Sequence, residues 1–483
     1  MPKLDQQSYL NLQSGLITAG AISEYRTPLD AVTESLNFKF NTIGSATLRE
    51  GTTRLGNQLS GDILGLYEFR DDGDGSNNQI VAVNGTTLYY LDGTTWTSQL
   101  TGLTSGAKAR FTTFLDFLWL VNGSDSTKIW NGNPATAFVA TGNASGAPTG
   151  KFIDNFRARV WIAGSDTYPD RVWFSSLPSA VTTPIVTWDT SVTTGDWIDI
   201  SPSDGENITG VKRSRRALLV FKNNHIYPIY SVAQTEADPI TAVGTYSNES
   251  IVEAKNGTYF HHPSGFYRFN IGSEPEEISK PIVDIIKNIS ASNYNDVCGW
   301  LETGGDDIVW AVGNVTIGGT TYNNLECRYT ISTQTWTHYE KPTQALVRSR
   351  YNDGTTLYQL IGDDDGNILK VDTGTTDNGT PISYSLIHRF YQIDGLNSTR
   401  KNITKLQFAH KGGTGSNVSW QNEEFIENEW KPLLQLGLSD TGTNNANIRG
   451  RKCRFRISGT STGESFSYYG FEVLEGNNEL IVF

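Results

Sequence analysis

The chain has 483 residues, a length that exceeds one compact domain unless that domain is a repeat-built β architecture. It contains 48 glycines, 12 tryptophans and a single methionine, and this mixture favours short strands and tight turns over helices. The formal net charge of -13 argues against a surface that generally attracts nucleic acid or anionic membranes.

Residues 1–60 are polar and open on MPKLDQQSYLNLQSG, which lacks the apolar core of a secretory signal. No stretch of the chain approaches the roughly 18 apolar residues that a membrane-spanning helix needs. We therefore expect a protein made in the cytosol with no membrane-spanning segment. Residues 1–60 are predicted to form an extended arm that also closes the following domain, with a short helix near Leu29 to Leu36.

Residues 61–375 repeat one pattern, in which an apolar strand, a tight turn and a second strand follow one another. The turns contain Asn-Gly, Asn-Asn, Ser-Gly or Asp-Gly, which favour hairpins. Small sheets of this kind bury their faces only when they pack radially against neighbours. We therefore predict an all-β fold with a β-propeller of about six to seven blades. The hairpins start near residues 80, 117, 159, 217, 257, 307 and 356.

Two of these hairpins end in similar phrases, GTTLYYLDGTTWTS and CRYTISTQTWTHY. Trp96 and Trp336 each follow the last apolar residue of the preceding strand, Leu91 or Ile331, by five positions. At that spacing the indole ring folds back across the turn and covers a sheet face. Both tryptophans are therefore predicted to be packing residues without a role in ligand binding.

From residue 376 onward the phrasing changes to alternating strands such as ISYSLIHRFYQI and RKCRFRISG. Alternation of this kind is typical of a β-sandwich. The sequence thus predicts three parts: an N-terminal arm with propeller closure at 1–60, a β-propeller at 61–375, and a β-sandwich platform domain at 376–483.

No catalytic, metal-binding or cofactor-binding signature stands out in the sequence. The phrase LDGTTWT resembles the Asp-box of sialidases, but Asp92 and Gly93 are adjacent where that motif separates them. His261 and His262 lie next to each other on a strand and so point to opposite faces, which prevents joint metal binding. We predict that the protein is not an enzyme and carries no cofactor and no metal.

The three cysteines, Cys298, Cys327 and Cys453, are too scattered for a disulfide framework or a zinc site. We expect them to be reduced core residues.

Four charged clusters stand out from this background. Two acidic turns lack the ligand spacing of an EF-hand, so exposed hairpin tips and a bound cation both remain open. Two basic runs fit solvated strand edges, a salt-bridged subunit interface or, third, contacts with DNA phosphates. The acidic turns contain Asp71, Asp72 and Asp74, and Asp363, Asp364 and Asp365; the basic runs contain Lys212, Arg213, Arg215 and Arg216, and Arg449, Arg451, Arg454 and Arg456.

Three stretches together resemble the tail hub or nozzle proteins of short-tailed phages, also called packaged-DNA stabilisation proteins. They are GLITAGAISEYRTPLDAVTESLNFKFNTIGSATLREGTTRLG, DGENITGVKRSRRALLVFKNNHIYPIY and NFRARVWIAG with the following RVWFSSL. The first is similar to the start of many tailed-phage structural proteins. There, Asn37, Gly44, Leu48, Arg49 and Gly51 stand near the places of a shared pattern, with Glu50 as a small departure.

The resemblance implies a structural subunit of the virion tail, assembled in the cytoplasm of the bacterial host. It implies a homomeric ring, commonly a hexamer, below the portal and adaptor, which retains packaged DNA and conducts it at ejection. An acidic protein suits this role because a channel that bound phosphates through many Lys or Arg side chains would hold the duplex.

In such a ring we expect the acidic turns to line the channel and the basic runs to lie at subunit contacts, with DNA passing without sequence-specific binding. The alternative function is a glycan-binding or glycan-cleaving propeller of a receptor-binding tail component. A generic protein-interaction propeller of cellular origin is the third reading.

Overall fold

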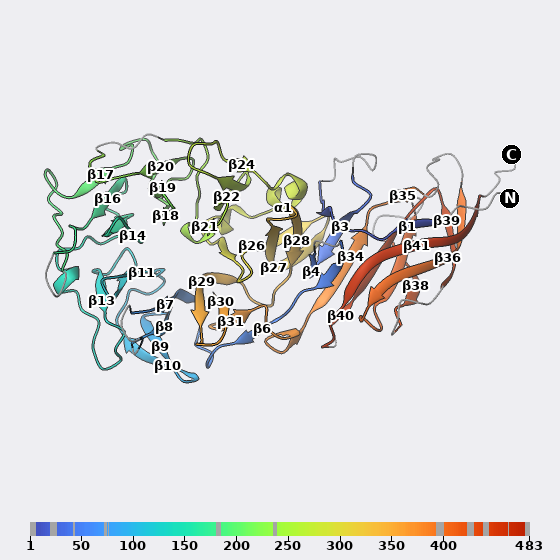
Figure 1. The fold of residues 1–483 in the computed structure, drawn as a ribbon, viewed down its shortest axis with the longest axis horizontal. Coiled ribbons are helices and arrows are strands. Elements are labelled where there is room, and N and C mark those ends of the chain that lie inside the picture. The colour runs from blue at the N-terminus through green and yellow to red at the C-terminus, as the bar shows by residue number, and fades with distance from the viewer. Residues whose placement is uncertain are drawn as a thin grey trace.

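The computed structural model describes residues 6–19, 27–41, 44–71, 75, 77–179, 185–234, 239–392, 400–422, 429–437, 444–461 and 463–478. Over these residues the chain is mostly β-structure in many small sheets, with one α-helix, α1 (Val283–Lys287). Figure 1 shows two bodies along the longest axis, with the elements β7 to β31 in one and the C-terminal strands in the other. None of the helices in the described residues has the length and apolar character needed to cross a bilayer.

The first body consists, in its described residues, of seven antiparallel units that follow chain order. Units 1 to 4 contain β7 (Ile63–Phe69), β8 (Gln79–Asn84), β9 (Thr87–Asp92) and β10 (Thr95–Leu100); β11 (Arg110–Phe114), β12 (Phe117–Val121) and β13 (Lys128–Trp130); β14 (Phe152–Phe156), β15 (Arg159–Ala163), β16 (Arg171–Phe174) and β17 (Trp197–Asp199); and β18 (Gly210–Arg213), β19 (Leu218–Phe221) and β20 (Ile226–Ile229).

Units 5 to 7 follow the same plan, and short 3-10 helices occupy some of the connections. The units contain β21 (Val252–Ala254), β22 (Gly257–His262), β23 (Gly265–Phe269) and β24 (Glu276–Glu277); β25 (Cys298–Leu301), β26 (Asp307–Ile317), β27 (Thr320–Thr330) and β28 (Thr335–Tyr339); and β29 (Ala345–Asn352), β30 (Leu357–Asp363) and β31 (Ile368–Val371). The 3-10 helices are η1 (Gly142–Ala144), η2 (Asn248–Ser250), η3 (Lys280–Ile282) and η4 (Ala291–Asn293).

The seven hairpins predicted from the sequence are confirmed, and each forms the second and third strands of one unit. Their turns explain why the sequence reveals them. Between β26 and β27, Gly318 and Gly319 have φ values of 56° and 82°, so both occupy the left-handed region that a tight two-residue hairpin turn requires.

Hydrophobic side chains join each unit to the next. Leu88 of unit 1 and Leu118 of unit 2 belong to one buried cluster, and the same holds for each successive pair along the chain. A further cluster contains Ile63 and Ile80 of unit 1 together with Leu360 of unit 7. Every unit therefore buries both of its faces against neighbouring units, including the first against the last.

Trp96 and Trp336 have the packing role predicted for them. Trp96 is 4% exposed and its Nε1 donates a hydrogen bond to the carbonyl of Leu55 at 3.1 Å. Trp336 is 1% exposed and its Nε1 donates to the carbonyl of Ile278 at 2.9 Å. Each ring thus fills space between units while its one polar group is satisfied.

The second body is a pair of packed sheets. One sheet has the order β39-β36-β41-β5-β4, with β1 beside β41. The other has the order β3-β34-β40-β37-β38, with β2 beside β3 and β35 beside β40, and it is continuous through β3 with the sheet of unit 6. The strands are β1 (Gln7–Tyr9), β2 (Gly15–Leu16), β3 (Ala31–Leu36), β4 (Phe38–Phe40), β5 (Ala46–Leu48), β34 (Ser383–His388), β35 (Tyr391–Gln392), β36 (Lys401–Lys411), β37 (Asn417–Asn422), β38 (Lys431–Gln435), β39 (Asn444–Gly450), β40 (Lys452–Thr460) and β41 (Ser467–Asn478).

A single apolar core joins the two sheets and draws on both ends of the chain. Phe38 and Phe40 from the N-terminal strands share it with Phe408, Phe455 and Phe471 from the C-terminal strands. The described part of residues 1–60 thus contributes strands to this body. The division of the chain at residue 375 stays a prediction.

The predicted helix near Leu29 to Leu36 is wrong, because Ala31–Leu36 forms strand β3. Val32 and Thr33 are β-branched and suit a pleated sheet. Strand β3 pairs antiparallel with β34 and, at Leu36, parallel with His338 of β28. Pairing with residues some 300 positions away, which local sequence does not reveal, decides the conformation.

Strand β6 (Thr52–Arg54), which follows these N-terminal strands, belongs to the other body. It pairs antiparallel with β31 of unit 7. The same sheet continues through β32 (Thr376–Asp377) and β33 (Thr380–Pro381). The described part of residues 1–60 therefore contributes strands to the last unit of one body and to both sheets of the other.

Arg49 lies at the junction of these elements. Its side chain is 1% exposed and donates to Asp377 Oδ1 at 2.9 Å, Asp377 Oδ2 at 2.5 Å, Asn37 Oδ1 at 2.8 Å and the carbonyl of Glu340 at 3.1 Å. Lys341 Nζ lies 3.4 Å from Asp377 Oδ1. Burial raises the pKa of Asp377, but the charges of Lys341 and Arg49 and their hydrogen bonds lower it by more. The net pKa is below its usual value, so the carboxylate stays ionised.

Other residues of the stretch 15–56 surround Arg49. Asn37 adopts a φ of 63°, and its Nδ2 donates to the carbonyl of Ser383 at 2.6 Å. A Cβ at Gly51 would lie 2.0 Å from the carbonyl oxygen of Thr376, so only glycine fits there. The stretch therefore encodes the contact between the N-terminal segment and the residues that follow unit 7.

We predict that Arg49→Met lowers the free energy of unfolding by about 3–5 kcal/mol, because it leaves the buried Asp377 carboxylate without its closest partner. Urea unfolding followed by circular dichroism measures the effect. Arg54→Met is the matched control, since Arg54 is exposed and makes only long hydrogen bonds of 3.3 and 3.4 Å to Gln58 and Asn367. Equal losses in both variants would contradict a special role for the junction.

Candidate functional site

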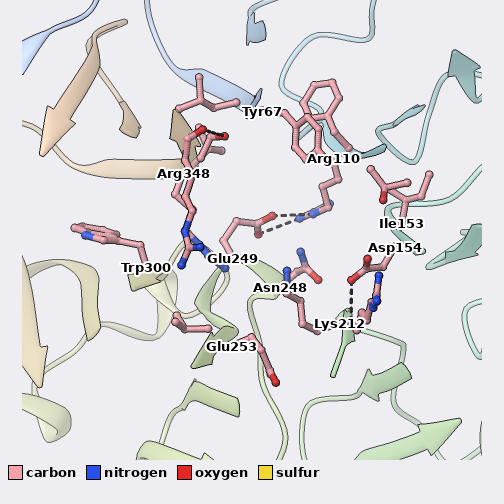
Figure 2. A pocket seen from close by; sticks show the side chains of 18 of the residues that line it. Tyr67, Arg110, Ile153, Asp154, Lys212, Asn248, Glu249, Glu253, Trp300 and Arg348 are labelled. Carbon is pink, nitrogen blue, oxygen red and sulfur yellow. Dashed lines mark hydrogen bonds and ion pairs between the residues drawn. The ribbon is translucent and has the colours of Figure 1, made fainter. Parts of the chain in front are cut away.

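Residues from the first strands of the seven units line a cavity of about 560 Å³. Figure 2 shows its lining side chains pointing inward from different units. Each unit contributes, and representative residues in chain order are Tyr67, Arg110, Asp154, Lys212, Glu253, Trp300 and Arg348. The cavity therefore depends on all seven units being in place.

The lining is cationic although the chain is acidic. Five basic side chains and three acidic ones line it, an excess of two positive charges in a chain of net charge -13. The basic residues are Arg110, Lys212, Arg213, Arg348 and Arg350, and the acidic ones are Asp154, Glu249 and Glu253. An adjoining hollow shares part of this lining and adds Arg215 and Lys255.

One ion pair crosses the cavity. Arg110 Nε and Nη2 donate to Glu249 Oε1 at 2.8 Å and Oε2 at 3.0 Å, and Figure 2 shows the two groups facing each other. Burial raises the pKa of Glu249, but the charges of Arg110 and Lys108 and the hydrogen bond from Arg110 lower it more, to about 2. Glu249 is therefore ionised at neutral pH and neutralises Arg110.

Arg348 has no such partner among the described residues. Its Nη2 donates to the carbonyl of Ile251 at 2.5 Å, while its buried Nε has no hydrogen-bond partner there. Burial lowers the pKa of Arg348 from its usual value, which the charges of Cys298 and Glu249 only partly offset. The guanidinium is thus held in a place where its charge is poorly balanced.

The two remaining carboxylates of the lining are engaged by donors without a charge. Asp154 Oδ2 accepts from the backbone N–H of Arg213 at 2.8 Å. Glu253 accepts from the hydroxyls of Thr258 at 2.6 Å and Ser214 at 3.3 Å. In the described residues neither forms an ion pair with a cavity lysine or arginine, so the positive excess of the lining persists.

The first basic run lies at the rim of this cavity. Arg213 Nη1 donates to Asn155 Oδ1 at 2.9 Å, and Arg215 Nη2 donates to the carbonyl of Lys255 at 3.0 Å. Lys212 is half-buried, whereas Arg213, Arg215 and Arg216 are exposed. Their assignment to a subunit interface stays a prediction.

The second basic run belongs to the other body and is separated from the first. Arg454 lies 4.5 Å from the ring centroid of Phe390 and donates to Gln421 Oε1 at 2.8 Å. Arg456 donates to Ser385 Oγ at 3.2 Å. Arg449 and Arg451 are exposed beside the connection between β39 and β40. The sandwich rather than the cavity therefore contains this run, whose interface role also stays a prediction.

The acidic turns differ from each other. Asp71 is half-buried and its Oδ1 accepts from the N–H of Gly75 at 3.1 Å, while Asp72 and Asp74 lie outside the described residues. Asp364 and Asp365 are exposed.

Asp363 corrects the expectation of an exposed channel-lining carboxylate, because it is 0% exposed. Its oxygens accept from the Thr343 hydroxyl at 2.7 Å and from the N–H of Asn367 at 2.6 Å. Asp363 stabilises its own turn through these hydrogen bonds, a role that Asp side chains commonly have in turns.

Sequence reasoning missed the residues that define the cavity. Arg110, Glu249 and the pair Arg348 and Arg350 lie in three separate segments, and none belongs to a motif. The alternation of Arg348, Ser349 and Arg350 places both arginines on one side of β29, the one local signal that was available.

The residues considered as metal ligands are structural. His261 is 0% exposed, and burial together with the charge of His262 lowers its pKa to about 3. The three cysteines are free and buried, as expected from their scattered positions. Among the described residues, no group of three or more His, Cys, Asp or Glu side chains is placed to hold a metal ion.

No family model and no curated protein matches the chain. Solved structures that resemble it include the computationally designed protein Ika8, with 8% identity, a TM-score of 0.38, and coverage of 66% of this chain and 100% of that one. YCF48 bound to D1 peptide has 11% identity, a TM-score of 0.41, and coverage of 70% and 98%.

A third is the extracellular domain described as that of a hybrid two-component system from B. thetaiotaomicron, with 12% identity, a TM-score of 0.43, and coverage of 76% and 45%. These scores are too low for an argument about fold or function.

We predict that Glu249→Gln changes the acid dependence of stability. The pKa of Glu249 is lower in the folded state, so its contribution is complete above the unfolded value of 4.5 and is lost as the pH falls through about 2. The wild-type free energy of unfolding should therefore lose about 3 kcal/mol more than the variant across that window. Urea unfolding between pH 6 and about pH 2 measures the difference.

Glu276→Gln is the matched control, because Glu276 also pairs with an arginine, Arg268, but is 58% exposed. Its pH profile should follow that of the wild type. A Glu249→Gln profile parallel to the wild type would show that the cavity ion pair contributes nothing to acid sensitivity.

Proposed function

We propose that the seven units are the blades of a seven-bladed β-propeller, which falls within the range expected from the hairpin spacing. Three observations support closure. The first strand of each unit lines one cavity, neighbouring units share buried clusters, and unit 1 shares such a cluster with unit 7. Strand β6 then adds an N-terminal strand to the last unit, which fastens the ring at its seam.

We further propose that the chain is a structural subunit of a phage tail, the hub or nozzle of a short-tailed phage. The observation that carries this proposal is the 11-stranded sheet that runs from unit 6 through β3 into the sandwich. Its N-terminal strand β3 and the neighbouring Arg49 lie within the stretch that resembles tailed-phage structural proteins, and they connect the two bodies. A homomeric ring closes only if each subunit presents its two contact surfaces at a fixed angle.

In this role the subunit forms a ring, a hexamer by the resemblance, on the portal and adaptor of the virion tail. Its contribution is to extend the channel, retain packaged DNA and conduct it at ejection. The net charge of -13 suits passage because it disfavours lasting contacts with DNA phosphates. The proposal includes no catalytic step and no cofactor.

We predict that the purified full-length chain assembles into a closed ring with a central pore, visible by negative-stain imaging and of a single stoichiometry by native mass spectrometry. Replacing Arg213, Arg215 and Arg216 with Ser should lower the ring fraction and make it more sensitive to salt, if the run lies at subunit contacts. Circular dichroism of the variant should match the wild type.

A matched triple variant of exposed basic residues away from both basic runs, Lys280, Lys287 and Lys411 to Ser, controls for the loss of three charges. A chain that stays monomeric at tens of micromolar, alone and with an adaptor ring, would contradict the proposed function and favour the glycan-binding alternative. A ring unaffected by the arginine variant would overturn only the interface assignment.

A further inference from the structure

Besides Arg213, which donates to Asn155 at the rim, three basic side chains line the central cavity without a carboxylate partner among the described residues. Arg348 and Arg350 lie two residues apart on β29 and line the cavity from unit 7, while Lys212 lines it from unit 4. Figure 2 shows Arg348 and Lys212 on opposite sides of the cavity. In the described part of the chain, none of the three forms an ion pair with a carboxylate.

This arrangement is costly without a ligand. A buried donor on a charged group that lacks an acceptor destabilises the fold, and Arg348 Nε is such a donor. Burial lowers the pKa of Arg348 most, and the like charge of the neighbouring Arg350 lowers it further. A negatively charged group between the arginines and Lys212 would offset both effects.

The chemistry of these groups selects an oxyanion. A guanidinium presents parallel N–H donors that match the paired oxygens of a phosphate or carboxylate, and a lysine adds a compact point charge. Asn248 also lines the cavity, and because its Oδ1 accepts from the N–H of Val211 at 3.1 Å, its amide donors are left for a ligand.

The volume of the cavity fits a small-molecule ligand. The cavity of about 560 Å³ lies within the range of about 300–1,000 Å³ that is usual for small-molecule sites. The Arg110–Glu249 pair occupies part of this space and presents no free charge, and Arg213 donates to Asn155 Oδ1 at the rim. The other unneutralised basic residues of the lining are Arg348, Arg350 and Lys212.

We propose that the central cavity binds a small anion with two or more negatively charged oxygen atoms, held by Arg348, Arg350 and Lys212. Phosphate esters and polycarboxylates share this chemistry. The site belongs to the single chain, so the proposal does not depend on ring assembly or on a role in a phage tail.

Isothermal titration calorimetry of the full-length protein at low ionic strength tests the site, with inorganic pyrophosphate and citrate as probes. We expect saturable binding of at least one probe with one site per chain. Binding of pyrophosphate alone identifies a phosphate ligand, binding of citrate alone identifies a polycarboxylate, and both results support the site.

Single substitutions assign the binding to this cavity. Arg350→Gln and Lys212→Gln, at exposed and half-buried positions, should each weaken binding about tenfold or more, and Arg348→Gln should do the same where it folds. Lys411→Gln, an exposed charge at the end of β36 in the sandwich, is the control and should leave affinity unchanged.

Two results would overturn the proposal. One is the absence of saturable binding of both probes at millimolar concentration. The other is binding that survives in the Arg350→Gln and Lys212→Gln variants, or that Lys411→Gln weakens equally, since each would place the anion elsewhere on the protein.

Discussion

The buried contact between Arg49 and Asp377 is the constraint on which the two-body arrangement depends. Arg49 lies between strands that belong to the sandwich and β6, which belongs to unit 7, while Asp377 follows unit 7 in the chain. The contact adds a buried link between the N-terminal segment and the residues that follow unit 7, beside the strand pairings of β3 and β6. A buried ion pair adds little net stability compared with apolar residues of similar size. Removal of one partner is strongly destabilising, so the pair favours the one arrangement of the two bodies in which both partners meet.

The same principle recurs elsewhere, where cations are enclosed by carboxylates. Lys222 is 0% exposed and lies 2.8 Å from both Asp170 and Asp204. Arg328 is 1% exposed and donates to Glu302 at 2.5 Å and Asp307 at 2.6 Å. Each of these cations has two carboxylate partners, which distinguishes it from Arg348 of the central cavity, which lacks a carboxylate partner in the described residues.

The structure thus combines two electrostatic features that serve different purposes. The net acidity of the chain suits the proposed passage of DNA without lasting contacts. The cavity lined by the first strands of the units, in contrast, concentrates positive charge inside a single chain. In the proposed ring, the DNA channel is formed between subunits and the cavity within each one. An anion in the cavity would stabilise the seven units against one another without meeting the DNA.

The sequence by itself determined the hairpins, which depend on neighbours in the chain, and the burial of the packing tryptophans, which follows from their large apolar rings. Pairs such as Gly318 and Gly319 set a turn, and the indole of Trp96 is buried as its apolar character predicts. Only the tertiary structure decided that Ala31–Leu36 is a strand, that Asp363 is buried, and that Arg110, Glu249 and Arg348 meet in one cavity. These outcomes depend on pairings between distant segments, and a residue's propensity and charge carry no information about which distant segment it will face.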